Sequence, residues 1–356
     1  MAGNVREWCW KETESGRVVR GGGWDDPVYM YNTESQLPPF DRSPKNGFRC
    51  VRYIDNEKIP VSALRQIKFI EARDFSKEKP VPENIFRIYK NQFLYDKTPL
   101  DAIIEKRDER SEDWIVDKIA FNAAYGNERM IAYLFLPKNG SPPFQTIMYF
   151  PGAYARGNTS DLINYRYATW NIDYILKGGR AVMYPVYKGT FERNDGTLEQ
   201  VNTDQSHQYT EWLIKWVKDL SRSIDYLETR PDIDCSKLGY YGISWGGALG
   251  GIISAVEERL AVSTIVTGGF NIHTRPLPEA DALNYVPRIR IPVLMLSGKY
   301  DVFFPPETAV KPFFNLLGTP PDDKRLIFYE TDHFMHPGDI IKETLNWLDR
   351  YLGPVK

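Results

Sequence analysis

The stretch YYGISWGGALGG, residues 240–251, places a serine between glycines directly behind a run of strand-forming residues. The preceding KLGYYG is expected to be a strand, and GGALGGIISAVEERL begins a helix immediately after the serine. So tight a turn from strand to helix strains the residue at its apex, and small residues must flank that residue. Its hydroxyl is then exposed at the carboxyl edge of the sheet. The free N–H groups of the helix N-terminus favour developing negative charge there. The stretch therefore predicts Ser244 as a nucleophile.

A serine hydroxyl is a poor nucleophile without a base, so this hypothesis requires a histidine and an orienting acid later in the chain. On a sheet of this kind the expected order is serine, acid, histidine, with the histidine after the final strand. The segment RLIFYETDHFMHPGD offers His333 directly after that strand and His336 three residues further, and we favour His333. The segment PVLMLSGKYDVFF supplies Asp301 just past the preceding strand.

Other acidic and histidine residues fit these roles less well. His207 precedes the serine, and His273 lies in a proline-rich loop before the last two strands. Glu307 is expected inside a helix, Asp332 is too close in sequence to its neighbour to orient it, and residues 322–323 lie in a proline-rich turn.

From about residue 112 onward, predicted strands and helices alternate. This alternation predicts an α/β fold with a mostly parallel eight-stranded sheet and helices on both of its faces. The clearest helix precedes the serine and ends at Arg230-Pro231. Its apolar stripe is expected in the core and consists of Trp212, Trp216, Leu220, Ile224 and Leu227.

The chain is expected to divide at residues 55 and 111. Residues 1–55 are rich in Trp, Gly, Tyr and Pro without a helical period and predict loops and short strands. Residues 56–111 are interpreted as a connector with short helices within 61–75 and 82–96, and residues 112–356 as the catalytic domain.

Composition excludes several classes of protein. Lys and Arg number 45 against 47 Asp and Glu, so nothing favours binding to nucleic acid or to an anionic membrane surface. The N-terminus lacks the plan of a signal peptide, and no apolar run is long enough to span a membrane, so we expect a cytoplasmic protein. Cys9, Cys50 and Cys235 have no metal-binding spacing and are expected to be buried free thiols. No metal or cofactor is expected, and the oligomeric state stays open.

Residues from about 112 to 353 resemble a serine α/β-hydrolase, with GISWGG as its nucleophile elbow, GKYD as its acid turn and TDHF as its histidine loop. The long helix and YFPGAYARG are most similar to the branch that holds dienelactone hydrolases, acetyl xylan esterases and prolyl-oligopeptidase-like domains. The resemblance implies an oxyanion hole formed by the backbone amides of Ala153 and Trp245. Pro151-Gly152 stands where the family usually has His-Gly, so the geometry of this loop is the main departure.

These residues predict a carboxylic ester hydrolase that uses Ser244, His333 and Asp301. Aromatic side chains adjoin the three positions and are expected to line the acyl and alcohol pockets; they are Tyr154, Trp245, Phe303, Phe304 and Phe334. Residues 271–290 contain three prolines and are too short for a multi-helix lid, so we expect water-soluble esters with acyl chains of about two to six carbons. The alternatives are a serine peptidase of the same branch and a non-catalytic binding module.

The N-terminal stretch has a second resemblance. GNVREWCW, RVVRGGGW and NGFRCVRY resemble the C-terminal end of the formylglycine-generating, sulfatase-modifying-factor family over residues 1–53. The oxidase chemistry of that family needs cysteines shortly after the RGG piece, and GGGWDDPVYMYNTESQ has none. We interpret these residues as the tail of an inactive, truncated module, the alternative being a Trp/Gly-rich loop region that packs on the main domain.

Overall fold

The computed structural model describes residues 3–13, 16–26, 31, 34–55, 59–61, 65–66, 72–165 and 169–355. The chain separates into two compact units, Met1–Ala72 and Arg73–Lys356. The helix expected within 61–75 falls largely outside the described residues. The domain boundaries expected at 55 and 111 stay predictions.

The first unit contains a small sheet with the strand order β3-β2-β1-β4. Its strands are β1 Arg6–Glu12, β2 Arg17–Arg20, β3 Glu34–Leu37 and β4 Asn46–Gly47. Val18 and Val19 of β2 are buried. Cys9 and Cys50 are free thiols, but Cys9 is half-buried and Cys50 is exposed, so the expectation of buried thiols was wrong here, as it was for the half-buried Cys235 of the second unit.

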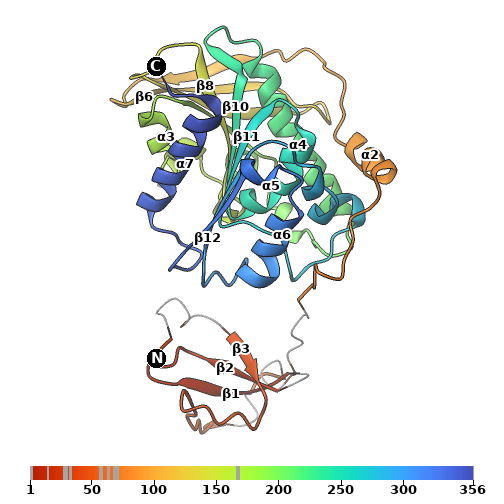
Figure 1. Ribbon diagram of the computed structural model, residues 1–356, viewed down its shortest axis with the longest axis vertical. Helices are drawn as coiled ribbons and strands as arrows, with labels where there is room; N and C mark the ends of the chain where they lie inside the picture. Colours follow the sequence, from red (N-terminus) through yellow and green to blue (C-terminus); the bar gives the residue numbers. More distant parts are fainter. Residues whose placement is uncertain are drawn as a thin grey trace. The chain divides into compact units, whose positions relative to one another are not determined.

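The second unit is built on a mixed sheet with the strand order β13-β12-β11-β10-β8-β9-β7-β6-β5 (Figure 1). The pairs from β13 to β9 are parallel, and the pairs from β9 to β5 are antiparallel. The α/β fold class is thereby confirmed. The strands are β5 Ile103–Asp108, β6 Trp114–Asn122, β7 Arg129–Pro137, β8 Phe144–Phe150, β9 Ala181–Val186, β10 Ile233–Ile243, β11 Leu260–Val266, β12 Val293–Gly298 and β13 Lys324–Tyr329.

The sheet gains one strand beyond the eight that were expected. This strand, β5, pairs antiparallel with β6 at the edge of the sheet. Its sequence, IIEKRD, is charged and mostly exposed, so it carries no alternation of buried and exposed residues that would predict a strand. It falls within the segment that was interpreted as a connector.

Helices cover both faces of the sheet (Figure 1). They are α2 Glu83–Asn91, α3 Asp173–Lys177, α4 His207–Leu227, α5 Trp245–Val256, α6 Lys311–Leu316 and α7 Pro337–Leu352. Buried residues of α4 and α5 pack on one face, and those of α3 and α7 pack on the other. The apolar stripe expected on the long helix is buried in α4, as predicted. Among the described residues, no helix combines the length and apolar character needed to cross a membrane.

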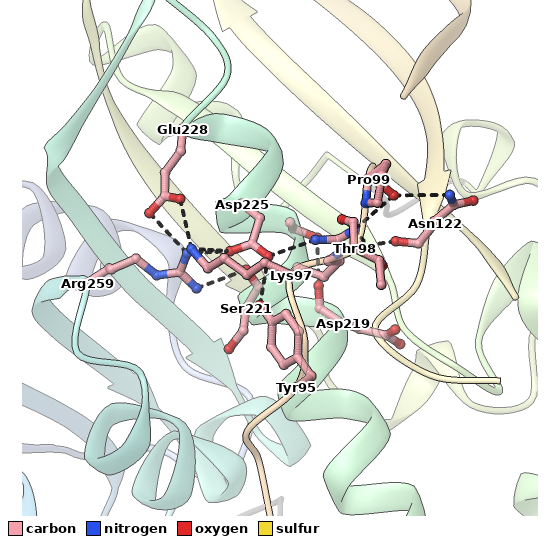
Figure 2. Close-up of polar contacts among 12 residues, drawn as sticks. Tyr95, Lys97, Thr98, Pro99, Asn122, Asp219, Ser221, Asp225, Glu228 and Arg259 are labelled. Atoms are coloured by element: carbon pink, nitrogen blue, oxygen red, sulfur yellow. Dashed lines mark hydrogen bonds and ion pairs between the residues drawn. The ribbon is translucent and has the colours of Figure 1, made fainter. Parts of the chain in front are cut away.

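A buried ionic cluster fastens residues 95–99 to α4 (Figure 2). The Asp225 carboxylate accepts hydrogen bonds from Arg259 at 2.7 Å, Tyr95 at 2.9 Å and Arg222 at 3.1 Å. Arg222 also donates to the carbonyl oxygens of Thr98 and of Asn122 on β6. The cluster therefore holds the chain that leads into β5 against the helix layer.

The cluster lowers the pKa of Asp225. Burial by itself raises the pKa of Asp225, but the hydrogen bonds from Arg259, Arg222 and Tyr95 outweigh it and hold the pKa below its usual value. A pKa that is lower in the folded state stabilises the fold above the unfolded-state pKa of about 4, and this contribution is lost as the pH falls through the folded-state value.

We predict that Asp225→Ala lowers the free energy of unfolding at pH 7 by about 3 kcal/mol, because it leaves Arg222 buried without its ionic partner. Glu258→Ala is the control: it removes an ion pair with Lys90 in which Glu258 is 81% exposed, and it should cost less than about 1 kcal/mol. Urea unfolding at several pH values measures both. The difference in free energy of unfolding between wild type and Asp225→Ala should shrink below about pH 4. Equal losses of stability in Asp225→Ala and Glu258→Ala would contradict a stabilising role of the cluster.

Candidate active site

Ser244 occupies a strained turn between β10 and α5. Its backbone angles are φ +54° and ψ −107°, a conformation that non-glycine residues rarely adopt. Its N–H donates to the carbonyl oxygen of Val266 on β11 at 2.9 Å, and its carbonyl oxygen accepts from Ala248 at 2.9 Å. The turn is therefore held from both sides, by the neighbouring strand and by the first turn of the helix.

The two glycines of the motif are required by close packing. A Cβ atom added to Gly242 would lie 2.5 Å from the carbonyl oxygen of Gly246. A Cβ atom added to Gly246 would lie 2.3 Å from the carbonyl oxygen of Phe150 at the end of β8. Both positions thus exclude any side chain, which explains why small residues flank Ser244.

Ser244, His333 and Asp301 come together from three loops at the carboxyl edge of the sheet. The imidazole Nε2 of His333 lies 2.8 Å from Ser244 Oγ, and its Nδ1 lies 2.8 Å from Asp301 Oδ2. The second carboxylate oxygen of Asp301 accepts the amides of Phe303 at 2.9 Å and Phe304 at 3.0 Å. Asp301 is only 2% exposed, so these bonds fix its carboxylate against the imidazole.

Three of the residues that were considered as alternatives have other partners. His336 lies at the N-cap of α7, where its Nδ1 accepts a hydrogen bond from the amide of Gly338 at 3.2 Å. Asp332 accepts the amide of Phe334 at 2.7 Å, and Glu307 pairs with Lys311. In this loop, His333 and not His336 is therefore the histidine that contacts Ser244 and Asp301.

The loop after β8 passes directly beside Ser244. Its Pro151 carbonyl oxygen accepts the amide of Gly246 at 3.0 Å, and a Cβ atom added to Gly152 would lie 3.6 Å from the Ser244 Cβ. Ala153 then begins a short 3₁₀ turn, Ala153–Ala155, and Trp245 begins α5. Within the described part of the chain, neither the Ala153 nor the Trp245 amide donates a hydrogen bond. Among the described residues, both N–H groups therefore lack an acceptor, in a loop where Pro151-Gly152 replaces the usual His-Gly.

A cavity of about 1750 Å³ opens over Ser244 and His333. The aromatic residues expected at the pocket all line it; they are Tyr154, Trp245, Phe303, Phe304 and Phe334. Tyr154 is tied back by a hydrogen bond of 2.9 Å between its hydroxyl and that of Tyr149, and burial raises its pKa. The Tyr154 hydroxyl therefore already has a partner within the protein, and the ring of Tyr154 is the part that can line the pocket.

Arg156 is a cavity residue that the sequence analysis did not single out. Its guanidinium lies 5.7 Å from the centre of the Trp245 ring, which also packs edge to face on Phe150 and Trp216. The guanidinium has no hydrogen-bond or ion-pair partner among the residues that the structure describes. Arg156 lies in YFPGAYARG, but only the fold reveals that this cation faces the cavity.

The model of the dienelactone hydrolase family matches residues 133–333, which is more than half of the chain. The chain belongs to the dienelactone hydrolase family. A second model, that of the sulfatase-modifying factor enzyme 1-like domain, matches residues 1–54. Both resemblances drawn from the sequence are thereby confirmed, and the family assignment places the chain among hydrolases.

Solved structures similar to this dienelactone hydrolase family member include esterases. The acetyl xylan esterase from Paenibacillus sp. R4 is 16% identical with a TM-score of 0.58, covering 78% of this chain and 98% of its own. Acetyl xylan esterase 1 from Thermoanaerobacterium sp. JW/SL YS485 is 17% identical with a TM-score of 0.59, covering 76% and 95%. A cold-adapted esterase from an Arctic intertidal metagenomic library is 16% identical with a TM-score of 0.51, covering 71% and 98%. These likenesses establish the fold. No curated protein matches the chain at a significant level.

We predict that a fluorophosphonate probe labels this family member at Ser244, because a hydroxyl that is hydrogen-bonded to an imidazole base is activated for attack. His333→Ala should slow labelling by about 100-fold or more, whereas His336→Ala should stay within about tenfold and lose only a helix cap. Labelling rates are compared among the wild type and the two variants, and mass spectrometry of the modified peptide identifies the labelled residue. If His336→Ala is the variant that loses labelling, the base has been assigned to the wrong histidine.

Proposed function

We propose that this chain is a carboxylesterase that hydrolyses esters through an acyl-enzyme on Ser244. The observation that carries this proposal is the pair of 2.8 Å contacts that link Ser244 Oγ to His333 Nε2 and His333 Nδ1 to Asp301. The match to the dienelactone hydrolase family supports hydrolysis as the type of reaction.

In the proposed mechanism, His333 takes the Ser244 proton as Oγ attacks the acyl carbonyl carbon. Asp301 holds the imidazole in the correct tautomer and stabilises the imidazolium. The imidazolium then returns the proton to the leaving alcohol oxygen as the bond between that oxygen and the acyl carbon breaks. Water then attacks the acyl-enzyme and gives its proton to His333. The bond between Ser244 Oγ and the acyl carbon breaks, the imidazolium returns the proton to Oγ, and the acid leaves.

The amides of Ala153 and Trp245 are the proposed oxyanion hole. They lie on the two segments that meet at Ser244, and neither donates to another acceptor in the described residues. Backbone donors that are fixed before the reaction need no reorganisation as charge develops on the carbonyl oxygen. Each such donor is worth about 2.7–4 kcal/mol in comparable sites.

The proposed substrates are water-soluble esters with short acyl chains. Residues 271–290 form three separate 3₁₀ turns, Pro278–Ala280, Ala282–Asn284 and Val286–Arg288, none of which has the length of a lid helix. Arg156 adds a cation to the cavity wall, and a long aliphatic chain laid against it would strip water from the charge. Both features favour short acyl groups.

Ser244→Ala should give a folded protein whose kcat for p-nitrophenyl acetate falls on the order of 10⁴–10⁶-fold, because the nucleophile of the acyl-enzyme is lost. The hydroxyl makes a hydrogen bond only to His333 in the described structure, so the unfolding midpoint should change little. Steady-state kinetics and thermal unfolding measure the two effects. Undiminished hydrolysis by this variant would remove Ser244 from the mechanism.

A series of p-nitrophenyl esters from C2 to C16 tests the acyl preference. We expect kcat/KM to peak between about two and six carbons and to show no jump above the micellar concentration of the longer esters, because no inserted lid has to open at an interface. A maximum at C10 or longer would overturn the short-chain proposal.

The same assay distinguishes a carboxylesterase from the alternative, a serine peptidase. Peptide nitroanilides release the same kind of chromophore through attack on an amide, so they are measured beside the esters under identical conditions. A kcat/KM for nitroanilides that equals or exceeds that for the best ester would reassign the enzyme to the peptidases. Hydrolysis of neither class by a folded wild-type protein would favour a binding module.

A further inference from the structure

Two exposed phenylalanines, Phe303 and Phe334, line the cavity and contact the ring of His333. Phe303 is 60% exposed and Phe334 is 78% exposed, and both line the cavity. Their ring centres lie 4.9 Å and 5.7 Å from that of the imidazole, and both rings meet it edge to face. Single exposed apolar residues are common, but here two aromatic rings contact the one side chain that is proposed to transfer the proton.

The two rings differ from Phe304, which packs on the same imidazole. Phe304 is 9% exposed, its ring is stacked on His333, and its amide helps to fix Asp301. Its role is thus accounted for by packing within the protein. Phe303 and Phe334 keep most of their surface exposed, although the amide of Phe303 also donates to Asp301.

The proposed mechanism indicates which part of an ester would meet these rings. The leaving oxygen receives its proton from His333 Nε2, so it must come within hydrogen-bond distance of that atom. The first carbon of the alcohol is bonded to this oxygen and therefore lies beside the imidazole and its aromatic neighbours. The acyl carbonyl oxygen, in contrast, points toward the amides of Ala153 and Trp245.

We propose that Phe303 and Phe334 form a binding site for an aromatic alcohol, so that the preferred substrates are short-chain esters of arylmethyl alcohols such as benzyl alcohol. This inference rests on the proposed function and names the leaving group that the same site selects. With the leaving oxygen at Nε2, a ring attached one carbon away would lie beside the imidazole that both phenylalanine rings contact. Edge-to-face contacts between rings add about two- to tenfold in binding beyond the burial of apolar area.

The experiment compares three acetate esters: benzyl, cyclohexylmethyl and ethyl. The first two have the same carbon skeleton, so the difference between them separates the effect of aromatic ring contacts from that of apolar burial. Each kcat/KM is divided by the rate constant of the same ester with hydroxide, which removes differences in leaving-group reactivity. The wild-type enzyme should prefer benzyl to cyclohexylmethyl acetate by about threefold or more and to ethyl acetate by about tenfold or more.

The double variant Phe303→Leu/Phe334→Leu keeps apolar bulk and removes both rings, so its benzyl preference over cyclohexylmethyl should vanish. Ile88→Ala, which shortens an exposed apolar side chain of α2 that does not line the cavity, should keep the wild-type ratio. Thermal unfolding and gel filtration check the fold and the oligomeric state of each variant.

Retention of the benzyl preference in the double variant, or its absence in the wild type, would overturn the inference while leaving the esterase intact. A change in oligomeric state with an unchanged benzyl preference would assign the two rings to an interface between copies and would also overturn it. Hydrolysis of none of the three esters, nor of p-nitrophenyl acetate, would overturn the proposed function and this inference together.

Discussion

The backbone of Ser244 can hold its strained conformation only because the turn is packed against neighbouring strands with no space for side chains. Contacts of 2.3 Å and 2.5 Å would arise from a single added carbon at Gly246 and Gly242. Hydrogen bonds to Val266 and from the Gly246 amide to Pro151 join the turn to β11 and to the loop after β8. This close approach positions both the hydroxyl and the two amides proposed to bind the oxyanion, so the rest of the site depends on it.

The parallel part of the sheet supplies the other members of the site. Strands β10, β12 and β13 all end at one edge, and the loops that follow them carry Ser244, Asp301 and His333. Each side chain is then oriented locally: the amides of Phe303 and Phe304 fix the carboxylate, and the carboxylate fixes the imidazole. The alignment of the three residues thus follows from strand order and short-range hydrogen bonds.

Sequence patterns predicted the fold class and the order of the candidate residues because the strand-turn-helix around Ser244 and the loops after the last two strands are local features. They did not predict β5, whose exposed and charged residues form a strand only by pairing with β6. Nor did they indicate that Arg156 faces the cavity or that the Tyr154 hydroxyl is held by Tyr149. Such contacts depend on how elements that are distant in the sequence pack together, so local sequence patterns do not predict them.

The most direct test of the account is to trap the acyl-enzyme. Wild-type protein is mixed rapidly with p-nitrophenyl acetate, quenched in acid within the first turnover, and the peptide that contains Ser244 is examined by mass spectrometry. The account predicts a burst of nitrophenol together with one acetyl group on Ser244, and no acetyl group in Ser244→Ala. Steady hydrolysis by the wild type without acetylation, or acetylation of a different residue, would contradict it.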